Sequence, residues 1–323
     1  MADAHHRAGS IQAVYPGEAG RPRGTSGHLS RTPTSRSTAN DGIARQAIDP
    51  AIASFYEQTP EEDRLGQGTF LLEQARTREL IGRFAPPAPA AVVDVGGAAG
   101  AYALWLAGAG YQVHLIDAAP RLVAEAARRS AAAARPLASC RVGDARSLEL
   151  PDAVADLVLL LGPLYHLTDA GDRIRSLAEA GRVLKPGGRL LAAAISRWSS
   201  ALDGLSRDLL HDPRFVSIVE QDLRDGQHRN PTDRLDYFTT AYFHHPQELA
   251  EEGQAAGLAV NGVYGIEGPG WILPDIEERM ADGRRRAALL DVARMVETEP
   301  AMVGTSAHLL LVAQRPETRH DIR

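Results

Sequence analysis

The sequence predicts an α/β fold in which a mostly parallel sheet carries helices on both faces. Short apolar runs of buried-strand type alternate with segments of helical length between residues 91 and 195. Such alternation is typical of right-handed βαβ units. The 323 residues are 44% hydrophobic and 24% charged, which is the composition of a globular protein with a sizeable core.

Two helices are expected ahead of the first strand, at residues 48–58 and 67–84. In the second of them, apolar side chains between Leu71 and Ile81 recur at helical spacing and fall on one face. The prolines that begin at Pro86 end this helix, because proline cannot continue it.

Five strands and three helices should then follow in alternation. The expected strands cover residues 91–95, 113–117, 139–142, 156–161 and 189–195. The expected helices between them cover residues 100–109, 120–134 and 169–185. Most of these strands are nearly continuous apolar runs, as is typical of strands that helices cover on both faces.

After residue 196 the alternation continues with two interruptions. A helix is expected at 246–256, a strand at 258–266 and a last apolar strand at 306–313. Polar, aromatic or charged insertions occupy residues 197–243 and 267–304. Insertions in α/β folds lie at loop ends, where ligands bind, so we expect both to form lids over a site.

The first 42 residues differ in composition from the rest of the chain. They are rich in Ser, Thr, Gly, Pro and Arg and contain almost no large apolar residues. Such a segment cannot bury enough surface to offset its ordering entropy. We therefore predict a disordered tail at residues 1–42 and one folded domain at residues 43–323.

Charge and cysteine content narrow the functional classes. The net charge of −6 argues against a general binder of nucleic acids or acidic membranes. Cys140 is the single cysteine, so the chain can form no internal disulfide, which suits a reducing cytoplasm. The uncharged stretch 95–113 is dominated by small residues rather than the large apolar residues of a spanning helix. We expect a cytoplasmic protein.

The strongest motif is the run from Asp94 to Gly100, Asp-Val-Gly-Gly-Ala-Ala-Gly, which follows a strand and opens a helix. Glycines there let the backbone pass close beneath a ligand. Asp117 ends the next strand, where a carboxylate can accept hydrogen bonds from both ribose hydroxyls of a nucleoside. Asp144, at the end of the third strand, can accept one from an exocyclic amine. As an alternative, either aspartate could be a helix N-cap.

The glycine spacing helps to choose the nucleoside. The dinucleotide fingerprint G-x-G-x-x-G fits poorly, because Ala98 stands at its second glycine when the pattern starts at Gly96. The pattern acidic-x-G-x-G-x-G fits from Asp94 to Gly100 with only this middle glycine changed to alanine. The phosphate-binding Walker pattern is absent.

The order of these motifs resembles the class I S-adenosylmethionine-dependent methyltransferases, in particular the bacterial small-molecule type. Residues 160–167 resemble the loop after the fourth strand, which lies under the methyl donor, and residues 182–188 resemble the turn before the fifth. The resemblance covers residues 45–315 and implies a Rossmann-like sheet of seven strands, the last one antiparallel. It makes residues 43–323 a methyltransferase domain and implies S-adenosyl-L-methionine as cofactor.

The resemblance also implies a set of cofactor-binding residues. They are Asp94, Gly96, Gly97, Ala98, Gly100, Asp117, Ala118, Gly143, Asp144, Ala145, Leu161 and Gly162. In the leading helices, Tyr56 and Arg76 are candidates for the carboxylate of the methyl donor; solvated helix surface is the alternative for both.

Methyl transfer is an in-line displacement at a carbon that the sulfonium already activates, so the protein mainly aligns the reactants and excludes water. A base is needed only if the acceptor keeps its proton. Tyr165 and His166 follow the fourth strand and are the catalytic candidates. An imidazole with its ordinary pKa of ~6.5 can take a proton from the acceptor; the alternative for His166 is a packing role.

A small organic acceptor is expected, because the insertions mix aromatic and polar residues. The candidate acceptor-binding residues are His228, Arg229, Tyr242, His244 and Trp271. We predict no metal site: the adjacent His244 and His245 would point in opposite directions on an extended chain, and no third ligand has a recognisable spacing.

Two other functions remain open on the sequence: a non-methylating member of the same fold and an NAD(P)-dependent oxidoreductase. A protein acceptor is also possible. A nucleic-acid methyltransferase is disfavoured, because the sequence from Gly162 to Tyr165 has no N/D-P-P-Y/F motif. The acceptor atom stays undetermined, and a homo-oligomer is possible.

Overall fold

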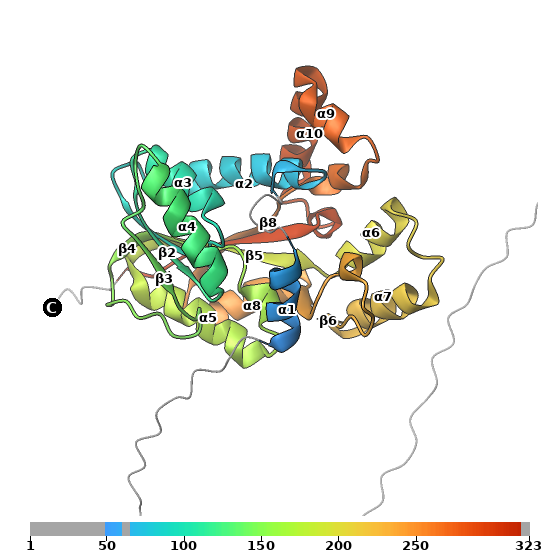
Figure 1. Ribbon diagram of the computed structural model, residues 1–323, viewed down its shortest axis with the longest axis horizontal. Helices are drawn as coiled ribbons and strands as arrows, with labels where there is room; N and C mark the ends of the chain where they lie inside the picture. Colours follow the sequence, from blue (N-terminus) through green and yellow to red (C-terminus); the bar gives the residue numbers. More distant parts are fainter. Residues whose placement is uncertain (1–48, 60–64, 318–323) are drawn as a thin grey trace, which may run out of the picture. The chain divides into compact units, whose positions relative to one another are not determined.

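The computed structural model describes residues 49–59 and 65–317. A nine-stranded sheet runs through this part of the chain (Figure 1). Its strands are β1 (Ala91–Val95), β2 (Gln112–Asp117), β3 (Ser139–Val142), β4 (Ala155–Leu160), β5 (Leu184–Ser196), β6 (Gln227–His228), β7 (Ala241–His244), β8 (Ala259–Gly265) and β9 (His308–Gln314). The predicted tail at residues 1–42 lies outside the described residues.

The strand order is β3-β2-β1-β4-β5-β7-β6, with β9 beside β5 and β8 beside β9. The strands from β1 to β5 pair in parallel, whereas β9 is antiparallel to both β5 and β8. The predicted mostly parallel sheet with an antiparallel last strand is thus confirmed. The carboxyl ends of β1, β2 and β4 therefore share one edge of the sheet.

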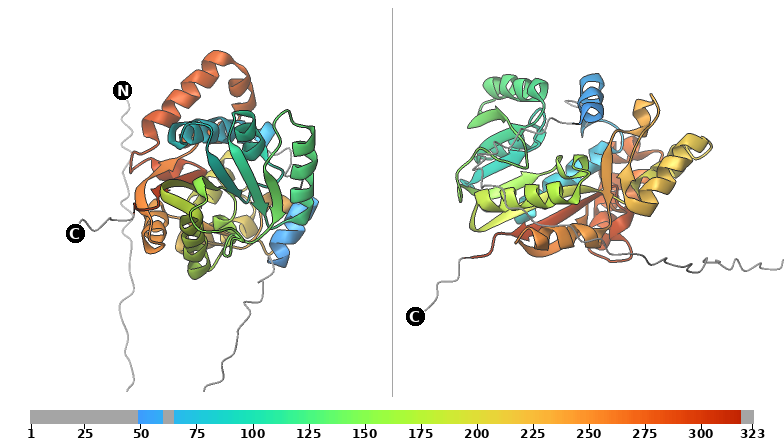
Figure 2. Two further views of the ribbon diagram at one scale, coloured as in Figure 1. Left: turned by 90° about the vertical axis from the view of Figure 1, so that its left-hand side faces the viewer. Right: turned by 90° about the horizontal axis from the view of Figure 1, so that it is seen from below.

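Helices cover both faces of the sheet (Figures 1 and 2). One face packs against α2 (Phe70–Phe84), α3 (Ala101–Gly108) and α4 (Pro120–Ala132), and the other against α5 (Ala170–Val183) and α8 (Pro246–Ala255). Neighbouring strand residues alternate between the two layers: Leu157 and Leu159 of β4 face the first, and Val158 and Leu160 face the second. Each such buried side chain contributes roughly 1.5–3 kcal/mol to the hydrophobic driving force.

The sheet has two more strands than the seven expected. The extra strands, β6 and β7, belong to the insertion at 197–243, which contains too many polar residues to indicate a strand. Ile195 of β5 pairs with Phe243 of β7 and also with His308 of β9. Because β9 occupies one edge of β5, β7 uses the edge that β4 leaves open beyond Leu160.

The remaining helices belong to the N-terminal segment and the two insertions. They are α1 (Pro50–Gln58), α6 (Ser199–Ser206), α7 (Pro213–Asp225), α9 (Ile276–Ala281) and α10 (Gly283–Val296). The helices α6 and α7 share a small apolar cluster centred on Phe215. Trp271 packs with Leu72 of α2 in another cluster, beneath α9 and α10. Nowhere among the described residues is there a helix with the length and apolar character needed to cross a membrane.

Candidate functional site

A cavity of about 740 Å³ lies at the carboxyl ends of β1, β2 and β4. This is the edge of an open α/β sheet where ligands bind, and the volume is within the range of small-molecule sites. The wall is formed by the loops after these strands, by α1 and α2, and by the chain around Ile266 and His308. Elements from most of the described chain thus meet at one site.

The glycine-rich turn after β1 forms the floor of the cavity. Gly96 has a φ of 74°, and a Cβ atom there would lie 2.4 Å from Cδ of Pro163. Only glycine fits this position without a shift of the loop after β4. Ala98 also adopts a left-handed conformation, with a φ of 46°. This costs an L-residue about 1 kcal/mol, and its N–H is held by a hydrogen bond to Asp117.

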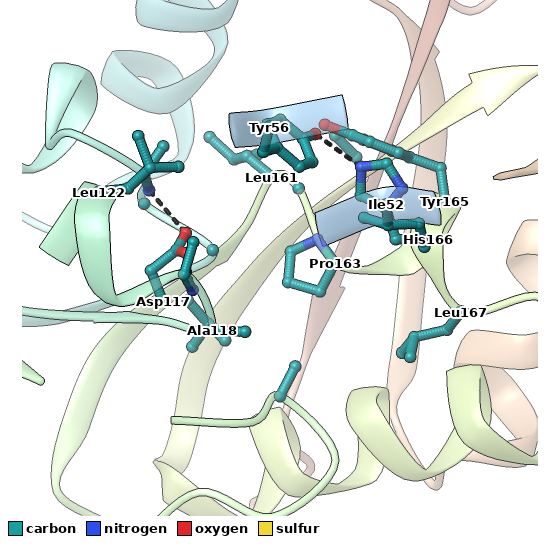
Figure 3. Close-up of a pocket in the computed structure, with 18 of the residues that line it drawn as sticks. Ile52, Tyr56, Asp117, Ala118, Leu122, Leu161, Pro163, Tyr165, His166 and Leu167 are labelled. Atoms are coloured by element: carbon teal, nitrogen blue, oxygen red, sulfur yellow. Dashed lines mark hydrogen bonds between the residues drawn. The ribbon is translucent and has the colours of Figure 1, made fainter. Parts of the chain in front are cut away.

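Asp117 is fixed at the end of β2 by two backbone donors. Its Oδ1 accepts from the N–H of Ala119 at 2.8 Å and its Oδ2 from the N–H of Ala98 at 2.9 Å. A carboxylate oxygen has two lone pairs, so both oxygens can accept a further bond from a ligand. Burial raises the pKa of Asp117. Asp117 and Ala118 lie on the opposite side of the cavity from Tyr56 and His166 (Figure 3).

Asp94 is a buried carboxylate in the wall of the cavity. It is 1% exposed, and its Oδ2 has no hydrogen-bond partner within residues 49–59 and 65–317. Burial, reinforced by the negative charge of Asp117, raises its pKa to about 7. A buried polar atom without a partner is rare in folded proteins. A ligand that brings a positive charge or a hydrogen-bond donor would satisfy it.

Asp144 lines the cavity after β3 in an ion pair. Arg146 binds its carboxylate with an N–O distance of 2.6 Å and also contacts Asp172 at 2.8 Å. Burial alone would raise the pKa of Asp144, but the hydrogen bonds and charge of Arg146 outweigh it and hold the pKa below its ordinary value. Asp144 is therefore a charged acceptor that Arg146 holds in place.

Tyr56 and His166 meet across the mouth of the cavity (Figure 3). The Tyr56 oxygen lies 2.6 Å from Nε2 of His166, and Nδ1 of His166 lies 3.3 Å from the carbonyl oxygen of Thr240. A carbonyl only accepts, so Nδ1 carries the proton and Nε2 accepts from the phenol. Burial lowers the pKa of His166 to about 4, so the imidazole is neutral at pH 7.

The structure brings almost all the predicted cofactor and catalytic residues together. Those that line the cavity are Tyr56, Asp94, Gly96, Gly97, Ala98, Asp117, Ala118, Gly143, Asp144, Ala145, Leu161, Gly162, Tyr165 and His166. Gly100 does not line it; it ends the glycine turn as the N-terminal cap of α3, with a φ of 86°.

The placement of Arg76 at the cofactor is wrong. Its side chain is fully buried behind the cavity wall and pairs with Glu297 at 2.5 Å. Its Nε–H also donates to the carbonyl oxygen of Ile266 at 2.9 Å. The guanidinium thus joins α2 to the segments that follow β8 and α10, which is a structural role that a single helix sequence cannot reveal.

The prediction that five residues bind the acceptor is also wrong, because none of them lines the cavity. His228 is 2.8 Å from Asp222, and His244 is 3.2 Å from Glu252. Both histidines are buried. No residue of the insertions 197–243 and 267–304 lines the cavity, so the expectation that they form lids over it is wrong. The chain around β6 and β7 instead pairs with neighbouring helices, because Asp222 lies on α7 and Glu252 on α8.

The other three predicted acceptor residues also have partners within the protein. Arg229 donates to the carbonyl oxygen of His228 at 2.8 Å, and the indole N–H of Trp271 donates to that of Thr305 at 2.9 Å. Tyr242 lies with its ring 3.6 Å from the Arg173 guanidinium. These contacts stabilise the two insertions themselves or join them to α5 and to the segment before β9.

Several cavity residues were not predicted. Among them are Ile52 on α1, Glu73 and Thr77 on α2, Ile266 after β8 and His308 at the start of β9. The available signal was topological: an antiparallel last strand begins at the edge where the parallel strands end. This places His308 beside the cavity although no motif surrounds it in the sequence.

Comparisons with known proteins agree with the methyltransferase resemblance of the motifs. Residues 93–192 match the family described as a methyltransferase domain. A ubiquinone/menaquinone biosynthesis C-methyltransferase UbiE of Acidiphilium cryptum (strain JF-5) is 34% identical over 154 residues, which are 47% of this chain and 59% of that protein. Across the curated relatives, the matches span 21% to 59% of the relative's length.

Solved structures share the fold at low identity. An S-adenosylmethionine-dependent methyltransferase from Mesorhizobium loti has a TM-score of 0.52 and 18% identity, over 76% of this chain and 100% of that chain. A putative methyltransferase from Haloferax volcanii, solved with the Trm112 methyltransferase activator, has a TM-score of 0.53 and 17% identity, over 84% and 100%. The match to the methyltransferase domain family falls on β1 to β5, whose loops build the cavity, so the comparison and the geometry identify the same part of the chain.

Proposed function

We propose that this protein transfers the methyl group of S-adenosyl-L-methionine to a small organic acceptor. The observation that carries the proposal is the position of Asp117. Its two oxygens are fixed by backbone donors at the cavity wall and keep lone pairs for the two ribose hydroxyls. The glycine turn beside it lets the backbone approach the ligand.

The rest of the cavity wall suits the other parts of the cofactor. The charged Asp144 and the backbone from Gly143 to Ala145 lie where they can receive the adenine. Asp94 offers an unpartnered carboxylate oxygen to the ammonium group of the methionine part. The cofactor supplies an activated methyl group when it is bound.

The residues around the mouth of the cavity would align the acceptor. Tyr165, Ile52 and the pair of Tyr56 and His166 present apolar and aromatic surface there. They hold the acceptor in line with the methyl group and exclude water, which are the main contributions that methyl transfer requires. Because its pKa is about 4, His166 holds the Tyr56 phenol as a neutral acceptor rather than serving as a strong base.

The acceptor is proposed to be a small molecule because the cavity volume of about 740 Å³ must hold both reactants. The net charge of −6 does not favour a nucleic acid. Quinol-type phenols are a reasonable first panel, since the relatives are named as C-methyltransferases of ubiquinone and menaquinone biosynthesis.

The test is an acceptor screen with the full chain and isotopically labelled methyl donor. We expect one or more acceptors to become one methyl group heavier while S-adenosylhomocysteine forms in equal amount. The Asp117→Ala variant should lose this activity, whereas Asp233→Ala, at an exposed position away from the cavity, should keep it. Tight binding of S-adenosylhomocysteine without any methylated product would favour a non-methylating member of the fold.

A further inference from the structure

We propose that Glu73, Glu267 and His308 form a binding site for one divalent transition-metal cation in the wall of the cavity. The three residues lie on α2, directly after β8 and at the start of β9, so they are far apart in the sequence. Glu73 and His308 line the cavity, and Glu267 lies behind them, 2% exposed. This inference is independent of methyl transfer, because metal binding is measured without an acceptor.

The three donor atoms converge as metal ligands do. Nδ1 of His308 lies 2.6 Å from Oε1 of Glu267 and 3.9 Å from Oε2 of Glu73. One ligand atom from each residue falls within 4.8 Å of the other two. Bonds of about 2.0–2.2 Å from Zn²⁺ to nitrogen and oxygen place tetrahedral ligand atoms roughly 3.5 Å apart. Small side-chain rotations therefore bring this set to a common ion.

A second layer of hydrogen bonds orients Glu267. Its Oε2 accepts from the Ser306 hydroxyl at 2.7 Å and from the backbone N–H of His308 at 3.0 Å, which directs Oε1 toward the cluster. The Ser306 oxygen is itself held by the N–H groups of Glu267 and Gly268, at 2.7 and 3.1 Å. Such outer partners are typical of ligands that hold metal ions.

Glu267 has no cationic side chain beside it in the part of the chain that the structure describes. It is 2% exposed, and its carboxylate bonds to Ser306 and His308 rather than to an arginine or lysine. A buried charge needs a compensating charge, which a metal ion bound by Glu267 and His308 would supply.

The donor set also selects the class of ion. One imidazole nitrogen with two carboxylate oxygens suits Mn²⁺, Fe²⁺ or Zn²⁺ better than the soft ions that prefer thiolate. In the metal-free protein Nδ1 of His308 donates its proton to Glu267. A metal that binds this nitrogen requires the neutral imidazole to carry its proton on Nε2 instead, so binding replaces the hydrogen bond between His308 and Glu267.

The test is calorimetric titration of the full chain with MnCl₂ and with ZnCl₂, after treatment with EDTA and desalting. We expect one equivalent of at least one metal to bind. In Glu267→Gln and His308→Gln that equivalent should bind at least about tenfold more weakly. Glu278→Gln, on an exposed face of α9, is the matched control and should bind as the unsubstituted protein does.

Circular dichroism in EDTA checks that each variant folds, and Glu73→Gln replaces any that does not. The inference is overturned if neither metal binds or if the cluster variants bind like Glu278→Gln. It is also overturned if methylammonium binds at the cluster as well as the metal does, since the cluster would then be an amine subsite. Titration with S-adenosylhomocysteine in EDTA tests the cofactor separately, so a failure there leaves the metal result standing.

Discussion

At the scale of single residues, the balance between folding and binding is clearest at Asp94. Its buried carboxyl has a pKa of about 7 against an ordinary value of 3.8, because burial and the charge of Asp117 disfavour ionisation. The folded state then holds the proton more tightly than the unfolded state between these values. Asp94 therefore lowers the free energy of unfolding progressively as the pH rises from about 4 to about 7.

Asp94→Asn should remove this pH-dependent fall in the free energy of unfolding. We expect the ligand-free variant to be more stable than the unsubstituted protein at pH 8 and to lose that advantage near pH 4. The same variant should bind S-adenosylhomocysteine more weakly, because the ammonium group loses a carboxylate partner. Denaturant unfolding at several pH values measures the first effect, with the exposed Asp233→Asn as control. Equal stability differences at pH 4 and pH 8 would contradict the account of Asp94.

A second prediction concerns the pKa of His166, which is shifted in the opposite direction to that of Asp94. Burial lowers the pKa of its imidazole to about 4, so it should stay neutral from pH 8 down to about pH 5. Nuclear magnetic resonance of ring nitrogens follows this titration directly, and the exposed His211 provides a reference in the same spectra. A midpoint between pH 6 and 7 for His166 would show that the imidazole is not buried as described.

Sequence and structure agree for residues whose role is local. The turn from Asp94 to Gly100 and the strand-ending Asp117 are recognisable because their positions at the cavity depend on a few consecutive backbone residues. The predicted roles of Arg76 and His244 were wrong because each side chain pairs with a residue of another element, Glu297 after α10 for Arg76 and Glu252 on α8 for His244. Sequence spacing carries no information about such partners.

At the scale of elements, α1 is the part of the site that most needs explanation. This helix reaches the cavity through Ile52 and Tyr56, and the carbonyl oxygen of Tyr56 accepts from Arg121 on α4 at 2.9 Å. The Thr239 hydroxyl also donates to the carbonyl oxygen of Ala51 at 3.2 Å, and the Tyr56 hydroxyl donates to His166 at 2.6 Å. The hydrogen bond from Tyr56 is thus one of the side-chain bonds that hold α1 beside the cavity.

Tyr56→Phe should loosen α1 without unfolding the protein. The change leaves Nε2 of the buried His166 without its donor, which costs about 1–3 kcal/mol. We expect amide hydrogen exchange in α1 to become several-fold faster while exchange in β1 and β4 stays unchanged. Tyr111→Phe, which removes a hydroxyl that donates to Pro86 at 2.7 Å, is the control. Unchanged exchange in α1 would mean that other contacts hold the helix.

The predicted elements succeeded where apolar periodicity is strong, as in β1, β4 and β9. The prediction missed β6 and β7, since Tyr242 and His244 interrupt the apolar pattern that Ala241 and Phe243 begin. Both polar side chains are satisfied by contacts with Arg173 on α5 and Glu252 on α8, which form only when the insertion packs against these helices. Tertiary partners thus override the local pattern in this insertion.

At the scale of the whole molecule, the topology explains how the site is assembled. Parallel strands end at one edge, and the antiparallel β9 starts at that edge, so residues from α1 to β9 line one cavity. The fold class followed from alternation alone, because a parallel sheet needs helical crossovers. The cluster of Glu73, Glu267 and His308 could not be predicted from the sequence, because its members meet only after the chain has folded.

The central claim is that S-adenosyl-L-methionine binds in this cavity with its ribose on Asp117, and calorimetric titration with S-adenosylhomocysteine tests it most directly. We expect one equivalent to bind and NADH and NADPH to give no heat of binding. Asp117→Ala should bind about 10- to 100-fold more weakly, the loss of charge-assisted hydrogen bonds worth roughly 1.5–3 kcal/mol, while Asp233→Ala binds normally. Binding of NADH instead, or equal affinity in Asp117→Ala, would contradict the account.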